Sequence, residues 1–226
     1  MERSTLISIP TALIFFLFLG GLLLILPLIL SEAFQLLGFG VGATILLFLS
    51  TLFGSTINIP IKTVKNRNVQ ERRNLRSIYN FMNPRTEPDN KSNKTTIAIN
   101  LGGALIPIGV SIFLILGNFS IWWQYLVGVL IITFLSYKMA KPVPGVGITL
   151  PLFIPPLMAA LIAVIMPGNN TAIAYVSGVL GVLLGGDILN LKSLTEYGSQ
   201  SLSIGGAGTF DGIFLTGIIA VLLASI

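Results

Sequence analysis

Long apolar stretches separated by polar connections dominate this chain. The stretches cover residues 6–30, 35–57, 97–117, 120–137, 146–166, 171–191 and 203–226. Each is close to the roughly 20 apolar residues that cross a bilayer as a helix. Because a membrane offers the backbone no hydrogen bonds, each stretch should be helical. The pattern predicts an all-α, polytopic transmembrane helical bundle of about seven spans. Residues 1–226 would form a single integral domain of a multi-pass cell-membrane protein.

The composition restricts the chemistry that the chain can perform. Hydrophobic residues make up 54% of the chain and charged residues 9%, which excludes an ordinary soluble domain. The chain has neither cysteine nor histidine, so catalysis or metal binding through thiols or imidazoles is excluded. We expect no metal and no cofactor, and any catalysis must use carboxylates, hydroxyls, lysine or the backbone.

The basic residues predict an orientation. With seven spans, all 13 Lys and Arg residues fall on the side of the N-terminus. They lie at Arg3, in residues 60–96, and at Lys138, Lys141 and Lys192. The positive-inside rule then places the N-terminus in the cytoplasm and the C-terminus outside. Trp122, Trp123 and Tyr125 begin the fourth span on the outer side, where interfacial aromatic anchors are expected.

Residues 60–96 are predicted to form a basic cytoplasmic loop between the second and third spans. The favoured interpretation is a topology determinant that lies on anionic lipid headgroups, at about 1 kcal/mol for each basic residue near the surface. The alternative is a docking site for a nucleic acid or an acidic partner. The loop lacks the interleaved aromatic residues that base stacking requires, so we expect membrane lipid and no nucleic acid as its partner.

Two acidic residues, Asp187 and Asp211, lie inside apolar stretches. A carboxylate at bilayer depth costs about 2.5–3.5 kcal/mol or more, so such residues are usually functional. They are predicted about 7–8 Å and 12 Å along helices that leave the same cytoplasmic connection. The pairs Gly181/Gly185 and Gly208/Gly212 have the spacing that lets helix backbones approach closely. Two neighbouring carboxylates would share a proton, and one could activate water while the other polarises a carbonyl.

A weak internal repeat surrounds these acids. Gly54-Ser55-Thr56-Ile57-Asn58-Ile59 resembles Gly186-Asp187-Ile188-Leu189-Asn190-Leu191, and Asn100-Leu101-Gly102-Gly103-Ala104 resembles Ser203-Ile204-Gly205-Gly206-Ala207. Two parallel repeats would gather a site at their interface, although chance similarity between Gly-rich helices is an equal alternative. The supporting residues that we predict for this site are Ser55, Asn58, Asn100, Asn190, Gly186, Gly206 and Gly208.

The connection between the fourth and fifth spans is the last predicted part of the site. Pro142 and Pro144, with the glycines that follow them, favour an extended or turning backbone. An extended segment beside the acids could pair with an unwound peptide substrate. The simpler alternative is a rigid connector.

Several sequence blocks resemble a known family. They are Gly54–Pro60, Asn100–Pro107, Lys141–Ile148, Gly186–Leu191 and Ser203–Leu215. The chain resembles the prokaryotic membrane family catalogued as domain of unknown function 1614, a resemblance that implies no activity. More loosely, the placement of Asp187 and Asp211 is similar to that in the presenilin, signal-peptide-peptidase and prepilin-peptidase group of diaspartyl intramembrane proteases. The motifs differ, because Phe210 stands where that group has glycine in G-x-G-D.

Three functions are compatible with these observations. The first hypothesis is a membrane-embedded diaspartyl hydrolase, similar to an intramembrane protease, with Asp187 and Asp211 as catalytic pair and a membrane protein or peptide as substrate. The second is a cation- or proton-coupled transporter or channel that uses the same acids as its ion site. The third is a structural or assembly protein in which the acids pair helices.

Overall fold

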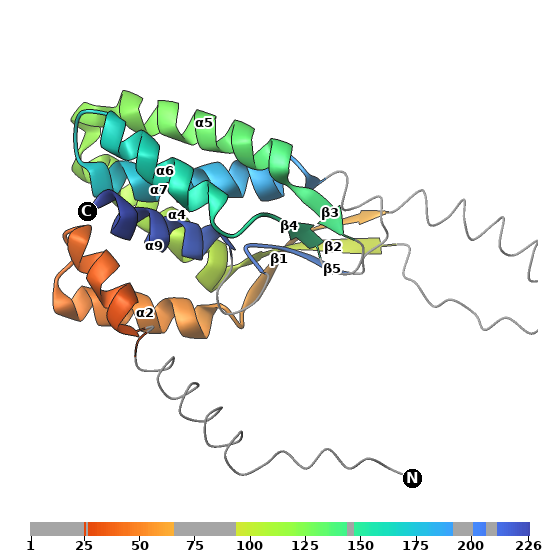
Figure 1. Ribbon diagram of the computed structural model, residues 1–226. Coiled ribbons are helices and arrows are strands. Elements are labelled where there is room, and N and C mark those ends of the chain that lie inside the picture. The colour runs from red at the N-terminus through yellow and green to blue at the C-terminus, as the bar shows by residue number, and fades with distance from the viewer. Residues whose placement is uncertain (1–24, 26, 66–93, 144–146, 192–200, 207–211) are drawn as a thin grey trace, which may run out of the picture.

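The bundle of helices carries its strands at one end (Figure 1). The computed structural model describes residues 25, 27–65, 94–143, 147–191, 201–206 and 212–226. These residues are mostly helical, as predicted. The first connection differs from the prediction: Ser31 and Glu32 lie within helical residues 27–36, and the chain turns at residues 37–40 instead. Gly38, with a φ of 90°, provides the turn before α2 (Val41–Gly54).

A three-stranded sheet corrects the all-α prediction. Its order is β1 (Asn58–Lys65), β2 (Lys94–Asn100) and β5 (Ser201–Ile204), with β1 antiparallel and β5 parallel to β2. Both ends of the predicted 60–96 loop are therefore strands, whereas residues 66–93 lie outside the described residues. Isoleucine, valine and threonine, which favour extended backbone, are frequent in β1 and β2.

The remaining elements are helices, helical turns and one two-stranded hairpin. They are η1 (Leu101–Leu105), α4 (Ile106–Gly117), η2 (Phe119–Ile121), α5 (Trp122–Met139), β3 (Lys141–Val143), β4 (Gly147–Thr149), α6 (Ile154–Ile165), α7 (Asn170–Val182), η3 (Leu183–Ile188) and α9 (Gly212–Ala224). Elements η1 and η3 are π-helical turns. The predicted fifth span is split into β4 and α6, because Pro155 and Pro156 occupy the first turn of α6, where a missing N–H is tolerated.

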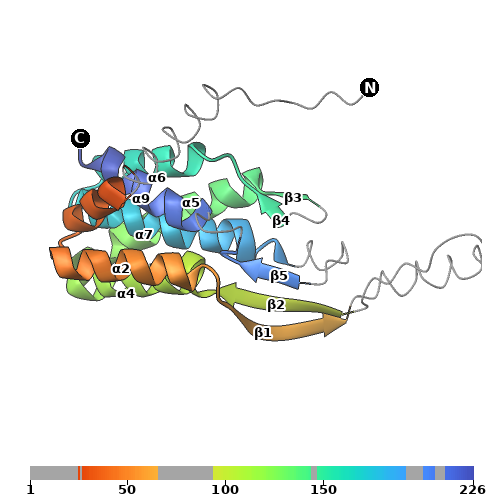
Figure 2. The same ribbon diagram turned by 90° about the horizontal axis from the view of Figure 1, so that it is seen from below.

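Helix α7 forms the centre of the bundle. It contacts α4, α5, α6 and α9, and its residues from Ala172 to Val179 are all buried. Glycines make this close packing fit: a Cβ added at Gly181 would lie 2.5 Å from the Cβ of Ile132 on α5. On another face, a Cβ added at Gly178 would lie 3.1 Å from Thr216 on α9. Figure 2 shows β1, β2 and β5 extending beyond the end of this bundle.

The outer helices expose large apolar side chains. Examples are Leu46 on α2, Phe113 on α4, Phe134 on α5 and Leu161 on α6, each more than half exposed. Among the described residues, the two stretches Phe119–Met139 and Asn170–Ile188 are long and apolar enough to cross a membrane. The first is mostly exposed and the second mostly buried. Apolar exposure of this extent is typical of a surface that contacts lipid or a partner.

Candidate functional site

A polar junction lies where the helices meet the three-stranded sheet, and Asn100 is its most buried side chain. Asn100 is 1% exposed. Its Nδ2 donates to the Ser55 carbonyl oxygen at 2.8 Å and to Asn58 Oδ1 at 3.0 Å. Its Oδ1 accepts from the Gly103 N–H at 2.7 Å and thereby caps η1. One buried amide therefore connects the end of α2, strand β1 and the first turn of η1.

Strand β5 joins this network from the C-terminal half of the chain. The Ser203 hydroxyl donates to Asn58 Oδ1, the same oxygen that accepts from Asn100. Two residues later, the Gly205 N–H donates to Asp187 Oδ2 at 2.9 Å. The structure thus brings predicted residues Ser55, Asn58, Asn100 and Asp187 to one junction through β5.

Gly205 can make this contact only as a glycine. Its φ is 66°, in the left-handed region that other residues rarely adopt. An added Cβ would lie 2.6 Å from the Ala104 Cβ and 2.8 Å from the Gly103 carbonyl carbon of η1. Gly205 therefore packs directly against η1 while its N–H holds Asp187.

Asp187 is the second-last residue of η3, so it lies at the end of its helix. The prediction placed Asp187 five residues before Lys192 in a helix that continued to residue 191, but η3 ends at Ile188. The carboxylate is half-buried, and it lies near the helix C-terminus, where the macrodipole disfavours negative charge by about 0.3–1 kcal/mol. The hydrogen bond from Gly205 offsets this cost. A basic residue would stabilise this helix end better, so local helix stability does not explain an acid here.

Asn190 has a local structural role. Its Nδ2 donates to the carbonyl oxygens of Gly185 and Gly186 at 2.8 and 3.0 Å. These are carbonyls of the last helical turn, which otherwise lack partners. The side chain is buried and turned back onto η3, so it ends the helix that carries Asp187.

The other predicted site residues are distributed around this junction. An added Cβ at Gly186 would lie 2.8 Å from Leu150 Cδ1, just after β4. Gly206 follows Gly205 and donates its N–H to the Ser203 carbonyl oxygen at 3.3 Å. Pro142 lies in β3, opposite Ile148, so the predicted extended backbone is confirmed at that residue. Asp211, Gly208 and Pro144 lie outside the described residues.

The glycine pair before Asp187 allows a close approach between helix backbones, as its spacing predicted. Gly181 and Gly185 pack against α5, where an added Cβ on Gly185 would collide with the Thr133 carbonyl oxygen. The pair therefore supports the α5–α7 contact.

The parallel pairing of β2 with β5 agrees with the predicted parallel repeat. Ile97 pairs with Leu202, and Ile99 pairs with Ile204. Each strand precedes the third helix of its predicted repeat: α4 follows β2, and α9 follows β5. Sequence reasoning did not include Ser203 and Gly205 among the site residues, although the repeat alignment contained both. The left-handed φ of Gly205 would have marked this residue, but a backbone angle cannot be read from the sequence.

Metal ligands do not gather in the part of the chain that the structure describes. No group of three or more His, Cys, Asp or Glu residues occurs there. Among the described acidic residues, Glu32 is exposed, far along the chain from Asp187. The junction therefore offers one carboxylate, several amides and hydroxyls, and backbone groups.

A family model described as "Protein of unknown function (DUF1614)" matches residues 52–223. The chain belongs to this family. The matched range includes every residue of the junction, from Ser55 near the end of α2 to Gly205 after β5, so the junction is part of the family's own domain. No curated protein and no solved structure matches the chain.

Proposed function

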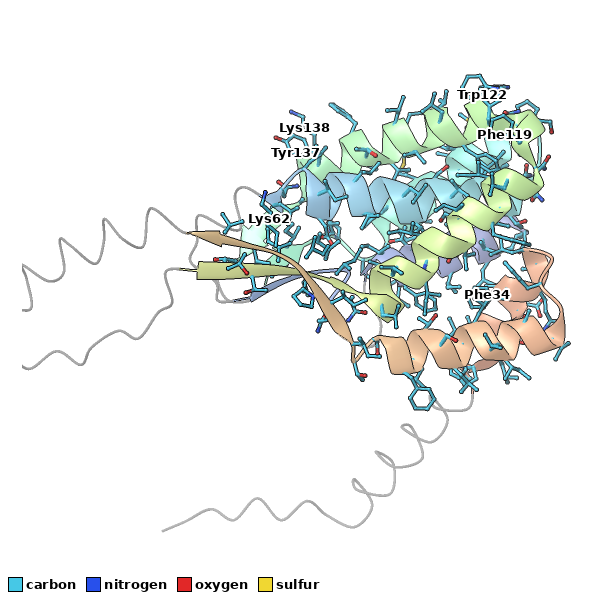
Figure 3. The ribbon with its side chains drawn as sticks, turned by 180° about the vertical axis from the view of Figure 1, so that it is seen from behind. Phe34, Lys62, Phe119, Trp122, Tyr137 and Lys138 are labelled. Atoms are coloured by element: carbon cyan, nitrogen blue, oxygen red, sulfur yellow. The ribbon has the colours of Figure 1, made fainter. Side chains whose placement is uncertain are left out.

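We propose that the protein is a multi-pass membrane protein of about seven spans, with its N-terminus in the cytoplasm and its C-terminus outside. The exposed apolar side chains of α2, α4, α5 and α6 support contact with lipid. Charge and aromatic positions support the orientation. Lys62 and Lys138 lie toward the strand end of the molecule, whereas Phe119 and Trp122 lie at the opposite end (Figure 3). The strand end is then cytoplasmic.

We further propose that the protein is a diaspartyl hydrolase that cleaves peptide bonds with Asp187 and Asp211. The observation that carries this proposal is the position of Asp187. It is a half-buried carboxylate at the unfavourable end of a helix, held by the Gly205 N–H beside strand β5. A residue that costs local stability and is fixed by a dedicated contact is a candidate for chemistry.

The proposed reaction follows from this arrangement. Ionised Asp187 takes a proton from a water molecule, and the resulting hydroxide attacks the carbonyl carbon of the peptide. Asp211 in its acid form donates a hydrogen bond to the carbonyl oxygen. The tetrahedral intermediate then breaks its C–N bond, and the proton passes to the leaving amine. We assign Asp187 as the base because the Gly205 N–H already fixes the position of its carboxylate.

Asparagine and alanine variants separate chemistry from folding. Asp187→Asn keeps an oxygen for the Gly205 N–H but cannot act as a base, whereas Asp187→Ala loses both properties. Asp211→Asn likewise keeps a side chain of the same size and shape but has no ionisable carboxyl group. Peptide cleavage should be lost in both Asn variants while they remain folded. Full cleavage by either Asn variant refutes the pair.

A transporter or channel is the second candidate, and the π-helical turns favour it. Turns η1 and η3 both lie at the junction, and interrupted helices commonly line ion sites in transporters. In this case Asp187 would bind a cation or a proton. Flux into proteoliposomes that is lost in Asp187→Asn, without any peptide cleavage, would select this candidate over the hydrolase.

A further inference from the structure

We propose that the junction lies at the headgroup level of the membrane, and that its substrate is the extended part of a polypeptide just outside a membrane span. The first statement concerns depth alone. The second rests on the proposed hydrolase. The sequence had placed Asp187 inside the hydrocarbon, about 7–8 Å of helix from the loop.

Helix α5 provides the first measure of depth. Trp122 and Tyr137 are both about half exposed near its two ends, and Lys138 follows Tyr137. Exposed Trp and Tyr side chains prefer the two membrane interfaces. The 15 residue steps from Trp122 to Tyr137 span about 22 Å of helix. Tyr125, which was predicted as an anchor, is buried against α4 and has no part in this measure.

Contacts between α5 and η3 give the depth of Asp187 relative to the two ends of α5. An added Cβ on Gly185 would meet the Thr133 carbonyl oxygen and, at 3.0 Å, the Ser136 Cβ. Gly185 therefore lies at the level of the last turns of α5. Asp187 is two residues further toward the strands, which is the level of Tyr137 and Lys138.

The helix that carries Asp187 gives an independent measure. It begins at Asn170, and Asn169 caps it by accepting from the Ala172 N–H at 3.2 Å. From Asn170 to Asp187 the chain rises about 25 Å. Both measures are shorter than a hydrocarbon core of about 30 Å, so a centred bundle places Asp187 within a few Å of the hydrocarbon boundary.

The other described helices are shorter still and support a thin apolar belt. Helices α2, α6 and α9 contain 14, 12 and 13 residues. A bilayer thins around such a bundle at a cost of fractions of a kcal/mol for each Å. Thinning brings water and headgroups toward the junction, which removes most of the cost of an ionised Asp187.

The substrate class follows from this depth. At the headgroup level water is available, and a polypeptide leaving its span can be extended because water satisfies its backbone. To expose a peptide bond in the middle of a span, the substrate helix would have to unwind within the hydrocarbon. That bond would also lie about 12 Å from Asp187, which is half of the length measured along α7 and η3. The junction therefore suits juxtamembrane peptide bonds on the side of the strands.

Single-cysteine variants test the depth, because the chain has no cysteine of its own. Leu189→Cys lies two residues after Asp187, and Leu130→Cys lies midway along α5; both leucines are more than half exposed. Each variant is spin-labelled in vesicles of phosphatidylcholine and phosphatidylglycerol, and its accessibility to a nickel chelate is compared with that to oxygen. We expect this ratio to be several-fold higher at residue 189. Equal ratios would overturn the proposal.

Two synthetic peptides test the substrate class with the wild-type protein in the same vesicles. Both contain one span, and an identical Gly/Ser-rich segment lies either just outside that span on the cytoplasmic side or at mid-span. Cleavage of the first alone supports the inference, and cleavage of the mid-span peptide alone overturns it. A water-accessible residue 189 without cleavage of either peptide would reject the hydrolase and its substrate class, while the depth assignment would stand.

Discussion

Replacing Gly205 by alanine tests the contact that positions Asp187. The new methyl group would lie 2.6 Å from the Ala104 Cβ and 2.8 Å from the Ala104 amide nitrogen, well inside van der Waals contact. The backbone would also have to keep a φ of 66° with a side chain attached. Strand β5 must therefore move away from η1, and the hydrogen bond from residue 205 to Asp187 Oδ2 is stretched or lost.

The magnitude follows from these contacts. The left-handed conformation costs a non-glycine residue about 1–2 kcal/mol. Overpacking against a rigid backbone costs about 1–3 kcal/mol. Loss of a hydrogen bond to a carboxylate costs about 1.5–3 kcal/mol. The three costs are not additive, because a strand movement that relieves the overlap also breaks this hydrogen bond. We expect a loss of about 2–5 kcal/mol in the free energy of unfolding.

The assay is reversible unfolding in mixed micelles, with Gly109→Ala as matched control. Gly109 is an exposed glycine within α4, and an added Cβ would meet nothing within 4 Å. Alanine should stabilise α4 there by up to about 1 kcal/mol. The double variant Gly205→Ala with Ala104→Gly should recover only part of the loss, because the Gly103 carbonyl carbon stays 2.8 Å from the new methyl.

One result would refute this reasoning. If Gly205→Ala unfolds within about 0.5 kcal/mol of wild type, the range of an ordinary surface substitution, then neither the left-handed backbone nor the η1 contact constrains the chain. A large loss in Gly109→Ala as well would show that glycine substitutions destabilise this bundle regardless of position.

Three further substitutions have defined outcomes in the same unfolding assay. Asn100→Ala removes the side-chain donors and the acceptor that join Ser55, Asn58 and Gly103. The free energy of unfolding should fall by about 2–4 kcal/mol. An unchanged midpoint of unfolding would show that the network is solvated. Gly185→Ala should separate α5 from α7 and cost about 1–3 kcal/mol, whereas Gly109→Ala again should not. Tyr175→Phe removes a buried hydroxyl that has no partner among the described residues, so stability should stay equal or rise by about 1 kcal/mol. A clear loss of stability would show that a bound water satisfies this hydroxyl.

The sequence predicted the helices best where each is long and uniformly apolar. The spans predicted at 120–137 and 171–191 correspond to Phe119–Met139 and Asn170–Ile188. Prediction was poorest where an apolar stretch changes structure partway along. Residues 97–100 and 147–149 read as parts of spans, yet they are strands. Ile97, Ala98 and Ile99 of β2 satisfy a hydrophobicity window as well as the start of a helix does, so hydropathy alone could not separate the two.

The candidate site was predicted in part. The predicted repeat gathered Ser55, Asn58, Asn100, Asp187, Asn190 and Asp211. Hydrogen bonds join the first three of these residues to β5, and β5 to Asp187. Sequence patterns did not identify Gly205, because the need for glycine there arises from η1, which is about a hundred residues earlier in the chain. Asn190 was assigned to the site, but its bonds lead back to its own helix.

The sequence by itself determined which segments avoid water and where an acid interrupts them, because these are properties of neighbouring residues along the chain. Only the tertiary structure decided what the acid touches. Strand β5 reaches Asp187 because it pairs with β2, and η3 ends beside β5 because glycines let α7 pack against α5. Such contacts join residues far apart in the sequence. They depend on the shapes of both partners at once, which no local pattern contains.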